Sequence, residues 1–108
     1  MNNATDATFT AKVLDRSATL PVVVDLWAAW CGPCRVLTPI LEKVVEESGG
    51  AVDLVAVDVD KNPRTAKAFG VQSIPSVFAF KDGKVVDSFI GARSERAVRK
   101  FVEKLVRR

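Results

Sequence analysis

The chain has 108 residues, of which 48% are hydrophobic and 27% are charged, and its formal net charge is +3. This length suffices for one domain with its own core, and the composition excludes a disordered chain. No apolar run approaches the roughly 20 residues that a transmembrane helix needs. The first residues, MNNATDATFT, lack the basic and apolar regions of a signal peptide, so we expect a cytoplasmic protein; the mature form of an organellar protein is the alternative.

The first half of the chain is predicted to alternate helices and strands. Residues 5–17 space their apolar side chains along one face of a helix. Residues 21–28 form a nearly continuous apolar run rich in β-branched side chains, which is typical of a strand buried on both faces. Residues 34–50 have helical periodicity, and we expect Pro39 to bend this helix and a Gly-Gly pair to end it.

The second half adds a strand, a short helix, a hairpin and a terminal helix. The strand is predicted over residues 52–60 and the short helix over 62–70. Residues 76–91 hold two β-rich runs around Asp-Gly, and residues 94–108 form an amphipathic helix. Strands joined through a helix run parallel, whereas a hairpin is antiparallel. We therefore expect a single α/β domain over residues 1–108, with a central mixed β-sheet flanked by helices on both faces.

Basic residues are concentrated at the C-terminal end. Residues 93–108 contain seven Lys or Arg against two Glu, a net charge of +5. Residues 1–92 contain nine basic and eleven acidic side chains, a net charge of −2. Cations favour the C-terminal end of a helix and a solvated face carries charge anyway, so we interpret the basic segment as a solvated face. Nucleic-acid binding is the alternative, but no interleaved aromatic residues accompany the charge.

The two cysteines of the chain, Cys31 and Cys34, lie in the stretch WCGPC. A structural zinc site needs four Cys or His ligands and the chain has no His, so we expect no metal. Two inert buried thiols are the alternative. Their position between a strand and a helix favours redox chemistry instead, because free N–H groups at a helix N-terminus stabilise a thiolate on Cys31. Cys34, one turn later, lies within reach of a disulfide with it.

Further candidate residues lie near these thiols. Asp25 interrupts the buried strand, where burial should raise its pKa. It is either a general base for Cys34 or a carboxylate paired with a local donor. Pro75, directly before a predicted strand, is typical of a turn or a cis peptide bond. Trp27 is expected to pack in the core, and Trp30 to contact a substrate.

The stretch WAAWCGPC, with Asp25, SIPS at 73–76 and the order of elements, resembles the thioredoxin family over nearly the whole chain. The resemblance implies a thioredoxin fold and a thiol–disulfide oxidoreductase, which reduces protein disulfides and carries electrons as a dithiol. It implies that Cys31 is the exposed attacking thiol and Cys34 the buried resolving thiol, and that the pair forms a redox disulfide. It also implies that Asp25 accepts the proton of Cys34.

The resemblance further implies a flat apolar surface that receives substrates by strand addition beside a cis-proline. Arg35 would support the active site from just outside this surface. The surface itself would consist of Trp30, Gly32, Pro33, Ile74, Pro75, Ile90, Gly91 and Ala92.

The resemblance also implies how electrons reach the chain. They would come from NADPH through a separate flavin-containing thioredoxin reductase, since the chain has no nucleotide-binding motif and is expected to bind no cofactor. The expected partners are this reductase and disulfide-containing proteins. We expect a monomer, with no membrane or nucleic-acid partner.

Three positions depart from the family pattern. Many bacterial members have a lysine near the buried acid where this chain has Ala56, so the pKa of Asp25 should rise further. Arg35 stands where lysine is common, which keeps the charge. The first strand of the family should precede residue 5, but MNNA is short and polar. We therefore expect residues 1–5 to be frayed or disordered and this strand to be frayed or missing.

Two alternatives to a reductase remain at this point. A disulfide oxidant or isomerase is disfavoured, because Gly32-Pro33 resembles the pair found in strongly reducing members. A binding or holdase module would use the groove beside Trp30 and Pro75, with incidental thiols. Replacing Cys31 by Ser separates these classes, since a pure binding module would keep its partners.

Overall fold

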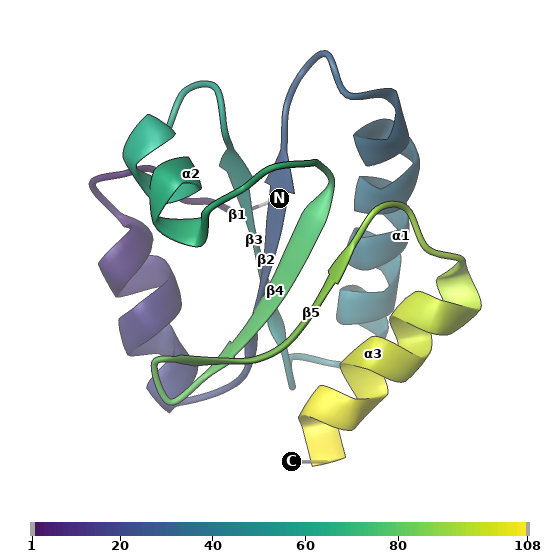
Figure 1. Ribbon diagram of the computed structural model, residues 1–108. Helices are drawn as coiled ribbons and strands as arrows, with labels where there is room; N and C mark the ends of the chain where they lie inside the picture. The colour runs from purple at the N-terminus through teal and green to yellow at the C-terminus, as the bar shows by residue number, and fades with distance from the viewer. Residues whose placement is uncertain (1, 108) are drawn as a thin grey trace.

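The computed structural model describes residues 2–107, which form five strands and three α-helices together with a π-helical and a 3₁₀ segment (Figure 1). In chain order these are β1 (Asn2–Asn3), the π-helix η1 (Thr10–Asp15), the 3₁₀ helix η2 (Arg16–Ala18), β2 (Val22–Trp27), α1 (Gly32–Glu47), β3 (Asp53–Asp58), α2 (Pro63–Phe69), β4 (Ser76–Lys81), β5 (Lys84–Ile90) and α3 (Glu95–Arg107).

The strands form one mixed sheet in the order β1-β3-β2-β4-β5. β1, β3 and β2 are parallel, whereas β4 is antiparallel to both β2 and β5. Helices α1 and α3 cover one face of the sheet, and η1 and α2 lie on the other (Figure 1). The predicted architecture, a mixed sheet between helices, is therefore confirmed.

The central strand β2 contributes to the cores on both faces of the sheet. Because successive side chains of a strand point to opposite faces, Val23 packs with the α1 and α3 side chains, whereas Val22 and Val24 pack on the η1 face. Asp25 is two residues after Val23, so its side chain points to the same face of the sheet, toward α1. The buried strand thus places a carboxyl group on the face that α1 covers.

The start of the chain differs from our expectation of a frayed or missing first strand. Asn2 and Asn3 pair in parallel with Val55 and Ala56 of β3, and the Ala4 N–H donates to the Ala56 carbonyl at 2.9 Å. Strand pairing uses backbone groups, so polar side chains do not prevent it. The Lys12 ammonium donates to the Asn3 carbonyl at 2.6 Å and fastens the same segment.

The first predicted helix is also shorter and less regular than residues 5–17 suggested. A turn precedes η1, and η1 and η2 together end at Ala18. α1 begins at Gly32, two residues before the periodic stretch 34–50 but directly after Cys31, and continues through Pro39 to Glu47. Within residues 2–107, none of the helices has the length and apolar character to cross a membrane.

Candidate active site

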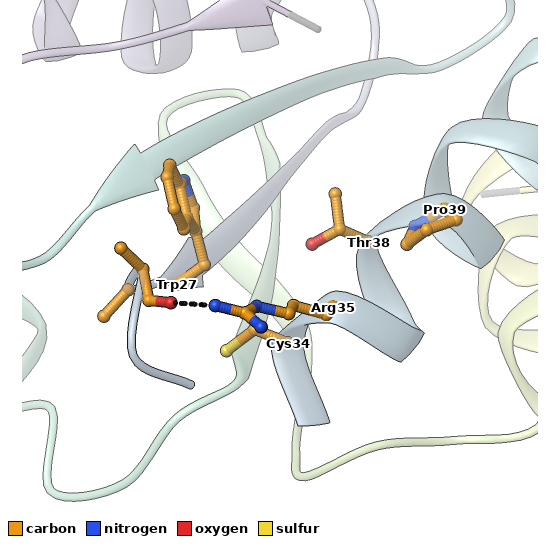
Figure 2. Close-up of a pocket in the computed structure, with 7 residues that line it drawn as sticks. Trp27, Cys34, Arg35, Thr38 and Pro39 are labelled. Carbon is orange, nitrogen blue, oxygen red and sulfur yellow. Dashed lines mark hydrogen bonds between the residues drawn. The ribbon is translucent and has the colours of Figure 1, made fainter. Parts of the chain in front are cut away.

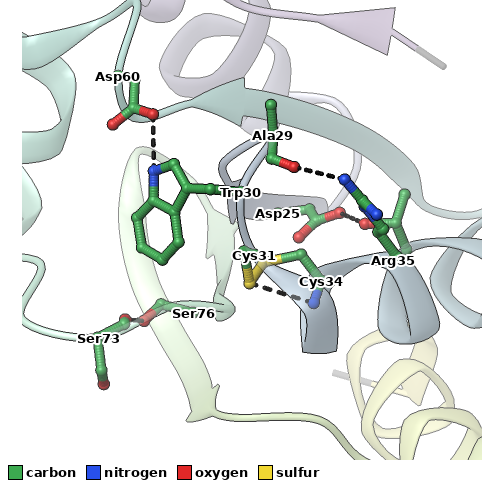
Figure 3. The surroundings of a disulfide bond; sticks show 10 residues. Asp25, Ala29, Trp30, Cys31, Cys34, Arg35, Asp60, Ser73 and Ser76 are labelled. Carbon is green, nitrogen blue, oxygen red and sulfur yellow. Dashed lines mark hydrogen bonds between the residues drawn. A yellow bond between two sulfur atoms is a disulfide. The ribbon is translucent and has the colours of Figure 1, made fainter.

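The two cysteines lie at the N-terminus of α1, where the chain passes from β2 into the helix. Cys31 is the N-cap of α1, with the backbone extended, and the Cys34 N–H donates to the Cys31 Sγ at 3.2 Å. A disulfide joins the two residues, whose Cα atoms lie 5.3 Å apart (Figure 3). Once reduced, the Cys31 sulfur faces the positive end of the helix dipole, which stabilises a thiolate.

The expected difference in exposure between the two cysteines is not found. Cys31 and Cys34 are each 3% exposed. Both pack with Ala28, and Ile74 and Val59 lie against this cluster. In the disulfide form these neighbours enclose Cys31, so its position at the helix end does not by itself expose it. The prediction that Cys31 is exposed is therefore wrong for this form.

Asp25 is fully buried beneath α1. The Thr38 hydroxyl donates to its Oδ2 at 2.7 Å, whereas Oδ1 has no hydrogen-bond partner among the described residues. Burial raises the pKa of Asp25 to about 6; the Thr38 hydrogen bond opposes this shift, and the nearby Glu42 carboxylate adds to it. In the sheet register, Asp25 lies opposite Ala56, so β3 presents a methyl group there.

Helical spacing relates Asp25 to the cysteine pair. Cys34 and Thr38 are four residues apart on α1 and therefore lie on one face of it. Asp25 is bonded to Thr38 and so lies along the face that carries Cys34, and Figure 3 draws it beside the disulfide. The sequence indicated Asp25, but not Thr38, because only the folded register brings β2 and α1 together at this point.

Trp30 stands out from the surface on the other side of the disulfide. Its side chain is 69% exposed, and its Nε1 donates to Asp60 Oδ2 at 2.8 Å (Figure 3). Asp60 was not among the predicted site residues, since it lies in the turn after β3, thirty residues further along. Arg35 is also exposed, and its guanidinium donates to the Ala29 carbonyl at 2.9 Å, which braces the loop before Cys31.

The residues expected to receive substrates come from three segments: the start of α1, the loop before β4 and the end of β5. The Ile74–Pro75 peptide bond is cis, and Ile74 packs against the cysteine cluster. The Gly91 N–H donates to the Pro75 carbonyl at 2.8 Å, which ties the end of β5 to this loop. Ile90 is 61% exposed, whereas Pro75 itself is buried. Gly32, Pro33 and Ala92 are also exposed.

Two pockets flank the cysteine pair. One lies between Trp30 and Ile74 and also includes Gln72 and Ser73, which were not predicted. The other, of about 320 Å³ and largely apolar, reaches Cys34 from the α1 side (Figure 2). It is lined by Trp27, Ala28, Ala29, Cys34, Arg35, Thr38 and Pro39.

Trp27 packs, as expected, and it also contributes to a pocket. Besides packing beside the cysteine cluster, its side chain lines the pocket behind Cys34, and its buried Nε1 has no partner among the described residues. Within residues 2–107, no group of three or more His, Cys, Asp or Glu side chains is placed to hold a metal ion.

A disulfide at the N-terminus of a helix, beside a cis-proline loop and a buried carboxyl group, defines a thiol–disulfide oxidoreductase. A sequence model of the thioredoxin family matches residues 1–104. The chain is 44% identical over 102 residues to a thioredoxin of Listeria monocytogenes, which covers 94% of this chain and 95% of that protein. It is 46% identical over 88 residues to thioredoxin 1 of Synechococcus elongatus, covering 82% of this chain and 80% of that protein.

A thioredoxin of Rickettsia felis is 38% identical over 105 residues, covering 97% of this chain and 98% of that protein. The chain therefore belongs to the thioredoxin family, as the motif predicted, and its Cys31–Cys34 pair supports disulfide reductase activity.

Proposed function

We propose that this chain is a general protein-disulfide reductase in which Cys31 attacks, Cys34 resolves and Asp25 accepts a proton. The observation that carries the proposal is the arrangement of both sulfurs at the N-terminus of α1, with Asp25 bonded to the same helix face through Thr38. This arrangement supplies a stabilised thiolate at Cys31 and a nearby base for Cys34.

In the first step, the Cys31 thiolate of the reduced protein attacks one sulfur of a substrate disulfide. A disulfide between Cys31 and the substrate forms, the substrate S–S bond breaks, and the second substrate sulfur leaves as a thiolate. The helix N-terminus supports this step because its N–H groups, including that of Cys34, keep the Cys31 sulfur in the ionised form.

In the second step, the Cys34 thiol gives its proton to the Asp25 carboxylate and attacks the Cys31 sulfur. The Cys31–Cys34 disulfide forms, and the remaining substrate sulfur leaves as a thiolate, so two electrons have passed to the substrate. With a pKa of about 6, the carboxyl group of Asp25 is mostly ionised at neutral pH and accepts a proton more readily than an ordinary aspartate.

The substrate binds across the surface formed by Trp30, Gly32, Pro33, Ile74, Pro75, Ile90, Gly91 and Ala92. An extended substrate segment pairs with backbone groups beside Pro75, as an added strand does. Support comes from the large exposed side chains of Trp30 and Ile90, and from the Gly91 to Pro75 hydrogen bond that holds the β5 end and the loop before β4 together. Arg35 supports the site by holding the loop at Ala29.

The electrons that restore the dithiol come from NADPH through a separate flavin-containing reductase. We place the protein in the cytoplasm and expect it to act as a monomer. The supporting observation is chemical: the chain supplies a dithiol and no nucleotide-binding motif, so a second protein must deliver the electrons.

Cysteine variants test this order of attack. Cys34→Ser, mixed with a disulfide-containing protein such as insulin, should accumulate a mixed disulfide that a non-reducing gel resolves. Cys31→Ser should form none and should lose reductase activity. Reduction of insulin by Cys31→Ser at the wild-type rate would overturn the assignment, as would a wild-type protein that binds insulin without reducing it.

A further inference from the structure

The two flanks of α3 differ in how their charges are neutralised. On the flank facing α1, Arg99 pairs with Glu47 at 2.7 Å and with Glu95 at 3.2 Å, and Lys43 also pairs with Glu95. The other flank carries Arg96, Lys100 and Lys104, and Arg93 lies just before the helix. All four are exposed, and none forms an ion pair with another described residue. We call these four residues the cationic face.

The positions of these cations lower the stability of α3. Arg96, Lys100 and Lys104 follow one another at intervals of four residues, so they are neighbours that repel each other. Their row spans about 12 Å, given the rise of an α-helix. Arg93 and Arg96 also lie at the N-terminal end of α3, where the dipole disfavours cations.

The cationic face borders a shallow groove between α3 and β5. Arg93, Lys100 and Lys104 line this groove, whose volume is about 250 Å³. Phe89 and Phe101 form its floor with their rings 5.0 Å apart, and the Arg93 guanidinium lies 5.4 Å from the centre of the Phe89 ring. Asp87 lines the groove too, so three cations and one carboxylate surround it and their sum remains positive.

The groove is continuous with the proposed substrate surface. Arg93 directly follows Ala92, at one end of that surface, and the Gly91 N–H is bonded to the Pro75 carbonyl. A substrate segment that leaves the cysteine pair along β5 therefore meets the cationic face next. An apolar floor with a cationic rim complements a peptide that carries acidic side chains.

We infer that the cationic face selects protein substrates with an acidic segment beside the disulfide. This inference rests on the proposed function, since the acidic segment and the disulfide belong to the same substrate. Nucleic acid would also be attracted by the charge, but Phe101 is 8% exposed, and the half-buried Phe89 ring is covered by the Arg93 guanidinium, so the groove offers no free aromatic face for base stacking.

Matched peptides test the inference. Each contains the same intramolecular disulfide, followed by a run of Glu, Gln or Lys residues, and the reduced protein is mixed with each in a stopped-flow instrument. We expect the acidic peptide to be reduced about threefold to tenfold faster than the neutral one, because surface charges act mainly on association rates. The difference should shrink at high ionic strength, where charges more than a few ångströms apart are screened.

Charge-reversal variants show which side chains of the protein cause the preference for the acidic peptide. Lys100→Glu should lower the ratio of the acidic to the neutral rate to one or below, and Lys104→Glu serves as a second variant if the first fails to fold. Lys67→Glu is the matched control, because Lys67 is exposed on α2, across the sheet, and the substitution changes the net charge equally. It should retain the preference of the wild-type protein.

The outcomes separate the inference from the function on which it rests. Equal rates for all peptides, or an equal loss of preference in Lys67→Glu, would overturn the inference while leaving the reductase intact. Failure to reduce the neutral peptide would overturn the proposed function itself. A DNA duplex that binds the wild-type protein at physiological ionic strength, but not Lys100→Glu, would overturn the assignment to acidic proteins.

Discussion

The Thr38 hydroxyl donates a 2.7 Å hydrogen bond to Oδ2 of Asp25, and the other carboxyl oxygen of this fully buried residue has no partner among the described residues. One oxygen is thus held by α1, and the other remains available for a proton. Since β3 presents Ala56 at the paired position, the hydroxyl is the polar contact that moderates the pKa of Asp25.

Removal of the Thr38 hydroxyl should raise the pKa of Asp25 above about 6, because the hydrogen bond favours the ionised form. Thr38→Val keeps the shape of the side chain. The measurement is an NMR titration of the Asp25 carboxyl carbon in the wild-type protein and the variant, both oxidised. An unchanged or lower pKa in Thr38→Val would contradict the assigned role of the hydroxyl.

The raised pKa of Asp25 should also make stability depend on pH. The folded protein holds the Asp25 proton up to about pH 6, whereas the unfolded chain releases it near the ordinary pKa of 3.8. The contribution of Asp25 to stability is therefore fully present below 3.8 and is lost as the pH rises through about 6. The difference between these two pKa values corresponds to about 3 kcal/mol in the free energy of unfolding.

Asp25→Asn isolates this contribution, because an amide does not titrate. Urea unfolding of the oxidised proteins across this pH range should show the fall in the wild-type protein and its absence in the variant. At neutral pH the variant should be the more stable of the two and the slower in resolving a mixed disulfide. A parallel pH dependence in both proteins would show that Asp25 does not titrate as described.

Loss of the Asp60 carboxylate should lower kcat/KM for substrate reduction several-fold but change the free energy of unfolding only slightly. Asp60 Oδ2 accepts the Trp30 Nε1 hydrogen bond at the surface, so Asp60→Ala frees the exposed indole and should cost about 1 kcal/mol or less in stability. We expect a several-fold lower kcat/KM for insulin reduction. A variant with unchanged kcat/KM would indicate that the position of the indole does not matter for the substrate.

Gly91 should resist substitution because of its backbone conformation. Its φ is +86°, outside the region that L side chains favour, although no neighbouring atom lies within 4 Å of the position that a Cβ would take. Gly91→Ala should therefore cost about 1–2 kcal/mol of stability through backbone strain. Gly32→Ala is the matched control for urea unfolding, since Gly32 has the same free space and no positive φ. Equal stability losses in both variants would refute the strain argument.

The sequence alone was sufficient for the features that depend on local pattern. The β-branched run at 21–28 predicted the buried strand β2, and the Asp-Gly pair predicted the β4–β5 hairpin. The position of Cys31 at a helix start followed from a strand end and a Gly-Pro pair. The family motif then added the cis peptide bond at Pro75, which local pattern alone leaves undecided.

Other features depend on contacts between distant segments, which no local pattern encodes. The polar β1 forms because β3 offers it an unpaired edge, and Trp30 meets Asp60 only once β2 and β3 are side by side. The Thr38–Asp25 bond depends on how α1 packs on the sheet. The burial of Cys31 depends on the disulfide and on Ile74, which comes from the loop before β4.

The reduction potential of the Cys31–Cys34 pair tests the central claim most directly. The protein is equilibrated against dithiothreitol, and the fluorescence of Trp27 and Trp30, both close to the sulfurs, reports the reduced fraction. A reductase requires a reversible two-electron transition at a potential more negative than that of the glutathione pool, and this is the expected result. A markedly higher potential, typical of an oxidant or isomerase, would contradict the account, as would the absence of any reversible transition.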